Sequence, residues 1–299
     1  MVRTRHPILN GGTMRDRTTS AAERIVRANG IELCYETFGD ARRPVLLLIM
    51  GLGFQLVHWP DAFCRQLAGR GFHVVRFDNR DAGRSTHLPG ADYALDDMAA
   101  DAVGLLDVLG ADRAHVVGAS MGGMIAQVMA ARHPSRVLSL ASLMSTTGRR
   151  GRGRTSPRLI RHLFSRAART EQQAVERRVR LFDTVGSPGF EQDVEEIRRA
   201  TALSFHRDPH HREGRRRQYR AVRAAGDRTD RLALITAPTV VIHGTADRMC
   251  HHSGGEATAA AINGAQLLLI PGMGHDLPPG AWPTIIDAIA GNAGRADRG

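Results

Sequence analysis

The stretch HVVGASMGGMIAQ, residues 115–127, places Ser120 between two glycines. Residues 114–118 form a short apolar run that predicts a buried strand, and residues 121–133 have the spacing of a helix. A G-x-S-x-G sequence bends the chain sharply from strand to helix, which strains the backbone of the serine and requires small neighbours. Such a turn lifts the serine hydroxyl away from the sheet, so we predict that Ser120 is a nucleophile.

The alternation of strand and helix runs along most of the chain. Asn29-Gly30 indicates a hairpin between two short strands. Apolar runs predict further strands at 44–50, 73–78, 137–144, 238–244 and 265–272, and helical spacing predicts helices at 59–71, 95–110, 254–263 and 282–291. Apolar strands separated by helices are typical of a mostly parallel sheet that is flanked by helices. The predicted fold class is therefore α/β.

One Arg-rich segment interrupts this alternation. Residues 145–231 hold 22 Arg and 11 Asp or Glu, so the segment carries 22 − 11 = +11, which equals the formal charge of the whole chain. The segment has helical stretches and no clear strand. We predict that it is a helical cap inserted between two core segments, 23–144 and 232–292. Residues 1–22 are predicted to form a flexible N-terminal arm, and residues 293–299 a C-terminal tail.

The composition disfavours several binding functions. The chain has no Lys, and exclusive use of Arg beside many Ala and Gly indicates a coding bias, so we interpret the charge as a solvated surface and expect no nucleic-acid partner. No apolar run approaches the roughly 18 residues of a membrane span. The pairs His210-His211 and His251-His252 lack metal-ligand spacing and are predicted to be exposed loop residues. We expect neither metal nor cofactor.

The cysteines and the N-terminus bear on the compartment. Cys34, Cys64 and Cys250 are an odd number with no C-x-x-C spacing, which argues against a disulfide framework and predicts a reducing, cytoplasmic location. The basic N-terminal stretch lacks the apolar centre of a secretory signal. Met1 and Met14 are both candidate start residues.

Three chemically complementary residues follow three different predicted strands. Because ligands bind outside the carboxyl ends of parallel strands, Ser120, Asp247 and His275 are expected at one edge of the sheet. A serine hydroxyl needs a neighbouring base, and a histidine base needs a carboxylate that orients it. Asp276, beside His275 in the chain, cannot easily face the same ring, which favours Asp247. The Met121 N–H, at a helix N-terminus, would point at an oxyanion formed beside the serine.

Together these motifs carry a resemblance to the α/β-hydrolase superfamily from about Glu23 to Gly291. The stretches MGLG…HWPDAF, RFDNRDAGRST, AHVVGASMGGMIAQ and IPGMGHDLP resemble the aclacinomycin methylesterase-like group of small-molecule esterases. The resemblance implies that Ser120 is the nucleophile, His275 the general base and Asp247 its orienting acid. It also implies hydrolysis of a methyl or other small carboxylic ester of a polyketide-type compound.

The same resemblance implies a second oxyanion donor in the loop after strand 44–50. Aligned on the family glycine, that donor is the Leu52 N–H, although Met50 stands where many relatives have His. Gly51 and Gly53 would let the backbone approach the substrate closely, and Trp59 is a candidate pocket residue. In FDNRDAGRS, residues 77–85, Asp78 and Arg80 are interpreted as structural braces under the site.

Two alternatives remain at this point. The same three residues occur in cofactor-free haloperoxidases (perhydrolases) and in enzymes that cleave carbon–carbon or amide bonds, because fold alone does not define the reaction. A non-catalytic module that only binds a ligand is disfavoured by the complete set of Ser120, Asp247 and His275.

Overall fold

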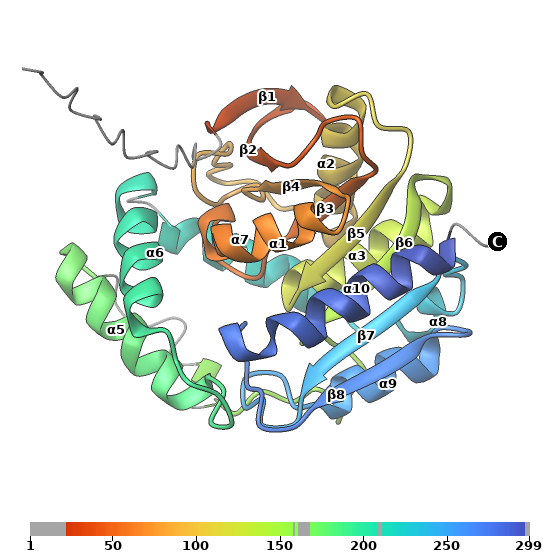
Figure 1. Cartoon of the computed structure of the whole chain (residues 1–299). Helices are drawn as coiled ribbons and strands as arrows, with labels where there is room; N and C mark the ends of the chain where they lie inside the picture. Colours follow the sequence, from red (N-terminus) through yellow and green to blue (C-terminus); the bar gives the residue numbers. More distant parts are fainter. Residues whose placement is uncertain (1–21, 158, 161–167, 209–210, 297–299) are drawn as a thin grey trace, which may run out of the picture.

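The computed structural model describes residues 22–157, 159–160, 168–208 and 211–296. All of the predicted arm except its last residue, and the His210 side of the first histidine pair, lie outside these residues. The strands are β1 (Arg24–Ala28), β2 (Ile31–Phe38), β3 (Val45–Ile49), β4 (His73–Phe77), β5 (Ala114–Ala119), β6 (Val137–Leu143), β7 (Thr239–Gly244) and β8 (Gln266–Ile270). They form one sheet in the order β1-β2-β4-β3-β5-β6-β7-β8 (Figure 1).

The sheet is mostly parallel, which confirms the predicted α/β class. Strands β4, β3, β5, β6, β7 and β8 pair in parallel, while β2 pairs antiparallel with β1 and with β4. The β1–β2 hairpin turns at Asn29 and Gly30, which have φ angles of 48° and 80°. Positive φ at both central residues is typical of the turn that the Asn-Gly pair predicts.

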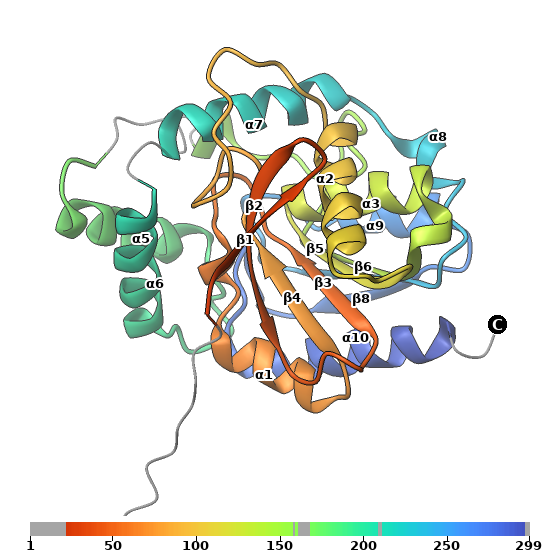
Figure 2. The ribbon, with the colours of Figure 1, turned by 90° about the horizontal axis from the view of Figure 1, so that it is seen from above.

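Helices cover both faces of the sheet. Helices α1 (Asp61–Gly69) and α10 (Trp282–Ala296) pack together on one face, and α2 (Leu95–Val108), α3 (Met121–Arg132), α8 (Thr229–Leu232) and α9 (Ser253–Ala261) lie on the other. Figure 2 shows this layering from above. None of the described helices is long and apolar enough to cross a membrane.

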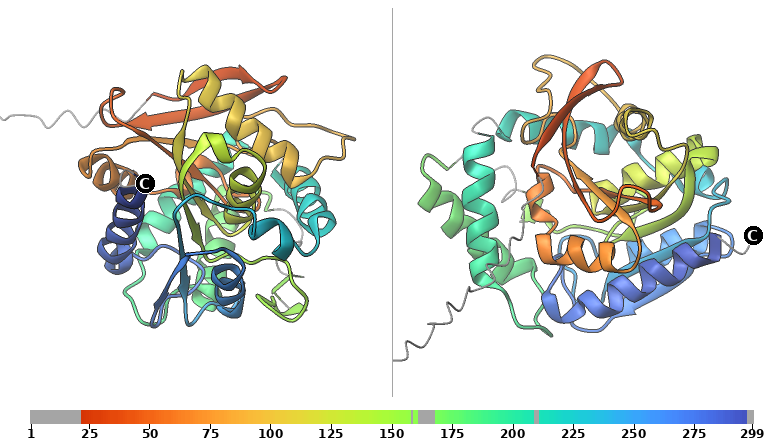
Figure 3. Two further views of the ribbon diagram at one scale, coloured as in Figure 1. Left: turned by 90° about the vertical axis from the view of Figure 1, so that its right-hand side faces the viewer. Right: turned by 45° about the horizontal axis from the view of Figure 1, so that its top comes forward.

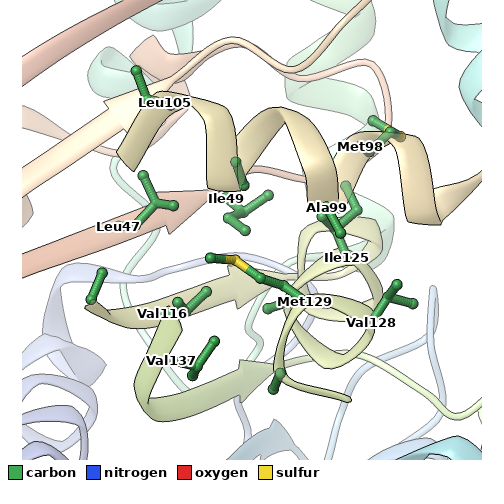
Figure 4. Packing of buried hydrophobic residues seen from close by; sticks show 14 of the residues in the cluster. Leu47, Ile49, Met98, Ala99, Leu105, Val116, Ile125, Val128, Met129 and Val137 are labelled. Atoms are coloured by element: carbon green, nitrogen blue, oxygen red, sulfur yellow. The ribbon is translucent and has the colours of Figure 1, made fainter. Parts of the chain in front are cut away.

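The central strand β3 illustrates how the core is divided. Leu46 and Leu48 belong to a first apolar cluster, which they form with side chains of α1 and α10. Leu47 and Ile49 belong to a second apolar cluster, with side chains of α2 and α3. Figure 4 shows the second cluster, where Leu47 and Ile49 lie beside Met129. Alternate residues of a strand point to opposite faces, and both faces here are covered, so the strand is apolar throughout.

The inserted segment, residues 145–231, follows β6 and precedes β7. Its described part consists of helices that are joined by loops. It contains α5 (Glu171–Val185), α6 (Val194–Arg207), α7 (His211–Ala225) and most of α8. Helices α5 and α6 pack on each other and stand apart from the sheet, beyond the carboxyl ends of its parallel strands, whereas α7 runs beside α2. The right panel of Figure 3 shows this separation from a further side.

The C-terminal boundary differs from the prediction. The tail was expected from residue 293, but α10 continues to Ala296. Asn292 donates hydrogen bonds to the carbonyl oxygens of Leu140 and Pro238, at 3.0 Å each, and Ala293 is buried. These contacts with the end of the sheet keep residues 293–296 helical.

The closest approach between a helix and the sheet gives a stability prediction. A Cβ atom on Gly122 of α3 would lie 2.0 Å from the Ile49 carbonyl oxygen, and backbone cannot yield as a side chain can. Gly122→Ala should therefore lower the free energy of unfolding by about 3 kcal/mol or more, measured by urea denaturation. Gly291→Ala in α10 is the matched control, since an added Cβ there meets nothing within 4 Å. The control should leave stability unchanged or raise it by up to about 1 kcal/mol; equal midpoints for both variants would contradict the packing described.

Candidate active site

Ser120 sits in the predicted strand-to-helix turn between β5 and α3. Its backbone has φ 56° and ψ −118°, a region that L-residues rarely adopt. A Cβ on Gly118 would lie 2.1 Å from the carbonyl oxygen of Gly122, so the turn closes only with glycine at this position. The strained turn is held by a hydrogen bond from the Ser120 N–H to the Leu143 carbonyl oxygen at 2.9 Å.

The three residues that follow separate strands come together in the structure. The Ser120 hydroxyl and the Nε2 atom of His275 are 3.0 Å apart. The Nδ1 atom of His275 lies 2.7 Å from Oδ2 of Asp247. The Asp247 side chain is fully buried, whereas the His275 side chain remains 13% exposed. A hydroxyl, an imidazole and a buried carboxylate thus form one chain of hydrogen bonds, and Ser120 at its end is partly exposed.

The Asp247 carboxylate is held on both of its oxygens. Its Oδ1 accepts the backbone N–H groups of Met249 and Cys250, each at 2.8 Å. Burial alone would raise the pKa of Asp247, but the charge of His275 and the surrounding hydrogen-bond donors hold that pKa well below its usual range. The carboxylate is therefore ionised and can keep the proton of His275 on Nδ1.

A second histidine, which the sequence analysis did not select, also contacts this carboxylate. His243, in β7, is completely buried, and its Nε2 lies 3.3 Å from Oδ2 of Asp247 and 2.8 Å from the Cys250 carbonyl oxygen. Because a carbonyl oxygen can only accept, Nε2 of His243 carries the proton. The only signal in the sequence is a histidine near the end of the otherwise apolar run PTVVIHG.

The loop that carries His275 is attached to the inserted segment. The His275 N–H donates to the Val185 carbonyl oxygen at 2.7 Å, and the Gly274 N–H donates to the Ser187 hydroxyl at 2.8 Å. Asp276 accepts a short hydrogen bond from the same hydroxyl. Burial raises the pKa of Asp276. Asp276 therefore serves this attachment, and Asp247 is the carboxylate that contacts the imidazole.

The loop after β3 lies directly against the serine. A Cβ on Gly51 would lie 3.2 Å from Cβ of Ser120, so this glycine brings the loop backbone close to the hydroxyl. The Phe54 N–H donates to the Gly51 carbonyl oxygen at 3.1 Å, which closes a turn around Leu52 and Gly53. Leu52 is partly buried. The predicted oxyanion loop is thus placed beside Ser120, and the role of its N–H groups remains a prediction.

Two side chains from distant segments hold this loop in place. Asn79 donates a hydrogen bond to the Met50 carbonyl oxygen at 2.9 Å. Gln218 of α7 accepts the Gly53 N–H at 2.8 Å, and its own amide donates to the Arg80 carbonyl oxygen at 2.8 Å. No periodicity in the sequence predicts these contacts, because the partners lie between 29 and 165 positions apart.

Trp59 does not line a surface that solvent can reach. Its exposed fraction is 0%, and its ring stacks on Phe63 with 5.9 Å between centroids. It belongs to the apolar cluster under α1 and α10. The predicted pocket role of Trp59 is therefore wrong in this structure, because the short turn after Gln55 folds the tryptophan into the core.

The stretch after β4 braces the site, as interpreted from the sequence. Asp78 is completely buried and accepts the Leu56 N–H at 2.7 Å. Arg80 forms two hydrogen bonds with Asp101, at 2.6 and 2.7 Å. These contacts join the loops after β3 and β4 to α2.

The inserted segment contributes a buried arginine to the same brace. Arg207, at the end of α6, donates to Asp78 at 2.8 Å and to Glu23 at 2.7 Å. Burial alone would lower the pKa of Arg207, but the two carboxylates raise it above its usual range. The expectation that the Arg-rich segment is a solvated basic surface therefore fails for Arg207, whose side chain is 1% exposed.

The remaining candidate ligands are accounted for within the described residues. Cys34, Cys64 and Cys250 are buried, and none forms a disulfide. His251 is exposed and His252 partly so. In the described ranges, no group of three or more His, Cys, Asp or Glu side chains is arranged to hold a metal ion.

Comparisons with known proteins agree with this architecture. A family model for the alpha/beta hydrolase fold matches residues 44–278. Rhodomycin D methylesterase DauP of Streptomyces sp. (strain C5) is 30% identical over 294 residues, which cover 89% of this chain and 96% of that protein. The rhodomycin D methylesterase DnrP of Streptomyces peucetius is 29% identical over the same shares of the two chains.

Solved structures share the fold at lower identity. The enol-lactonase from Burkholderia xenovorans LB400 superimposes with a TM-score of 0.70 at 23% identity, covering 92% of this chain and 100% of that one. The match to residues 44–278 spans most of the chain, from before β3 to beyond His275. The protein therefore belongs to the α/β-hydrolase fold family.

Proposed function

We propose that the protein is a serine hydrolase that cleaves carboxylic esters of small molecules. The observation that carries the proposal is the hydrogen-bonded chain from Ser120 through His275 to the buried Asp247. His275 removes the proton of the Ser120 hydroxyl as Oγ attacks the ester carbonyl, and it then protonates the departing alcohol. Water activated by His275 hydrolyses the acyl-enzyme and regenerates the serine.

The oxyanion of each tetrahedral intermediate binds the N–H groups of Leu52 and Met121. Met121 is the first residue of α3, where a backbone N–H has no partner within the helix and the helix dipole favours negative charge. Gly51 brings the Leu52 loop next to Ser120. Donors fixed before the reaction stabilise the developing charge without reorganisation, which is the largest contribution in many enzymes of this kind.

The substrate class follows from the relatives. DauP and DnrP, which match almost their whole length, are rhodomycin D methylesterases. We therefore propose a methyl ester, or another ester of a small alcohol, on a larger polyketide-type acyl part.

The inserted segment acts as the cap over this site. It holds the His275 loop through Val185 and the oxyanion loop through Gln218. Arg207 and Arg217 of the cap are paired with carboxylates of the core, which removes them from any nucleic-acid surface. We propose a small molecule as the binding partner.

Replacing the proposed nucleophile tests the function directly. Ser120→Ala should lower kcat for p-nitrophenyl acetate by a factor of about 10³ or more, because no other group forms the acyl-enzyme. A serine-reactive phosphonate should add one adduct, located on Ser120 by mass spectrometry. Ser135→Ala, at an exposed serine in the turn before β6, is the control and should keep wild-type activity. Wild-type protein that hydrolyses no ester and takes up no phosphonate would refute the proposal.

The low pKa of Asp247 gives a prediction for the pH dependence. Since the folded pKa is depressed, Asp247 stays ionised as the pH falls until well below the usual carboxylate range. Asp247 should then take up no proton over the acid side of the kcat/KM profile, so a plot of log kcat/KM against pH should have a slope of no more than 1 there. Steady-state rates with a methyl ester, followed by proton release, measure it. A slope of 2 would mean that Asp247 titrates in the same range.

A further inference from the structure

Arg178 of α5 lies over the oxyanion loop. Its guanidinium carbon is 4.1 Å from the centroid of the Phe54 ring. Phe54 is joined to Gly51 by the hydrogen bond that closes the loop, and Gly51 lies against Ser120. A β-turn of this kind keeps its first and last Cα atoms within about 7 Å. The guanidinium therefore lies over a loop whose first residue, Gly51, is packed against Ser120.

The orientation of α5 places Arg178 on the face toward the site. Val185, seven residues further along the helix, is the residue whose carbonyl oxygen holds the His275 N–H. Residues seven apart share a helix face and are separated by about 10 Å along the axis. Helix α5 thus runs from the His275 loop to Phe54, and Arg178 is about two turns of the helix away from the residue that holds the His275 backbone.

No carboxylate of the described residues neutralises this arginine. Among the described residues, Arg178 forms no ion pair and no hydrogen bond, and its contact is with the face of the Phe54 ring. Burial and the charge of Arg215 lower the pKa of Arg178 to about 10. The side chain of Arg215 covers Gly53, the residue before Phe54, so a second positive charge stands beside the loop.

Other arginines of the inserted segment differ in this respect. Arg207 is paired with Asp78 at 2.8 Å, and Arg217 with Asp81 at 2.6 Å. Buried or partly buried charges are normally paired, because desolvation of a lone charge is costly. Among its described residues, the segment therefore has paired arginines that hold it to the core, whereas Arg178, over the proposed oxyanion loop, is partly buried without an anionic partner.

A buried ring nitrogen beside Arg178 also lacks a hydrogen-bond partner among the described residues. The Nδ1 atom of His58 lies 3.1 Å from the Gln55 backbone nitrogen and 3.2 Å from the Gln55 carbonyl oxygen. Within the described residues, Nε2 of His58 is buried and makes no hydrogen bond. The His58 ring packs edge-on against Phe54, with 4.5 Å between centroids. Burial, followed by the charge of Arg178, lowers the pKa of His58 and keeps it neutral.

We propose that Arg178 binds a carboxylate on the acyl part of the substrate, remote from the ester that Ser120 attacks. A carboxylate matches the guanidinium in charge and can accept two parallel hydrogen bonds from it. The inference rests on the proposed function, in which the alcohol part is too small to carry the charge. The substrates are then half-esters, in which one carboxyl group is esterified and a second is ionised.

A matched pair of esters tests this preference. Mono-p-nitrophenyl adipate and p-nitrophenyl hexanoate have the same six-carbon acyl chain and differ in the terminal carboxylate. Wild-type protein should have the higher kcat/KM for the adipate. Arg178→Gln should reduce the ratio of the two kcat/KM values by about ten- to a hundredfold, the usual value of a hydrogen bond to a charged group. Half-esters of succinate, glutarate and suberate then report the distance that the acyl chain spans.

Two variants separate this role from a structural one. Arg178→Lys keeps the charge and should retain part of the adipate preference. Arg180→Gln removes an exposed arginine on the same helix, which is 3.8 Å from Glu176, and should leave the ratio unchanged. Circular dichroism establishes that each variant is folded. An unchanged ratio in folded Arg178→Gln, or a wild-type preference for the hexanoate, overturns the inference and leaves the esterase proposal intact.

A binding measurement covers the case in which no ester is hydrolysed. Calorimetry with monomethyl adipate and the Ser120→Ala variant should give binding that weakens by a similar factor when Arg178→Gln is added. Failure of the hydrolysis assay with this binding intact would remove the esterase proposal only. Absence of binding, or equal binding with and without Arg178, would remove the carboxylate site.

Discussion

The backbone conformation of Ser120 is the constraint on which the site depends. A φ of 56° is available to this serine only because Gly118 and Gly122 leave space for the turn, and α3 then lies against the carbonyl of Ile49 in β3. Strain of this kind costs on the order of 1–3 kcal/mol and persists where the surrounding structure holds it. Here the adjacent strand β6 holds it through the Leu143 carbonyl oxygen. The hydroxyl is thereby presented to His275, and the first N–H groups of α3 to the same space.

The inserted segment is part of the site and does not merely cover it. Val185 holds the backbone of His275, and Gln218 holds the backbone of Gly53. Both are hydrogen bonds to main-chain atoms, so the inserted segment positions the loops whatever their side chains are. Arg207 extends the attachment to the buried Asp78. A shift of α5 or α7 would therefore reach the proposed base and the proposed oxyanion loop directly, without an intermediate element.

The arginines of the inserted segment have different environments although they are all the same residue type. Arg180 is exposed and lies on the surface of α5. Arg207 and Arg217 are inserted among core carboxylates and act as attachment points. Arg178 faces the proposed oxyanion loop with an aromatic ring and a second guanidinium as neighbours. The arginines that contribute to the net charge of +11 thus have at least three different roles.

The sequence alone determined the fold class and the meeting of Ser120, Asp247 and His275. Both follow from local patterns, because apolar strands alternating with helices form a parallel sheet and the carboxyl ends of its strands share one edge. The tertiary structure decided what periodicity does not encode. It buried Trp59, placed His243 on the Asp247 carboxylate, and paired Arg207 while leaving Arg178 without a carboxylate from the described part of the chain. These environments are set by contacts between residues far apart in the chain, and those contacts exist only once the sheet and the inserted segment have packed.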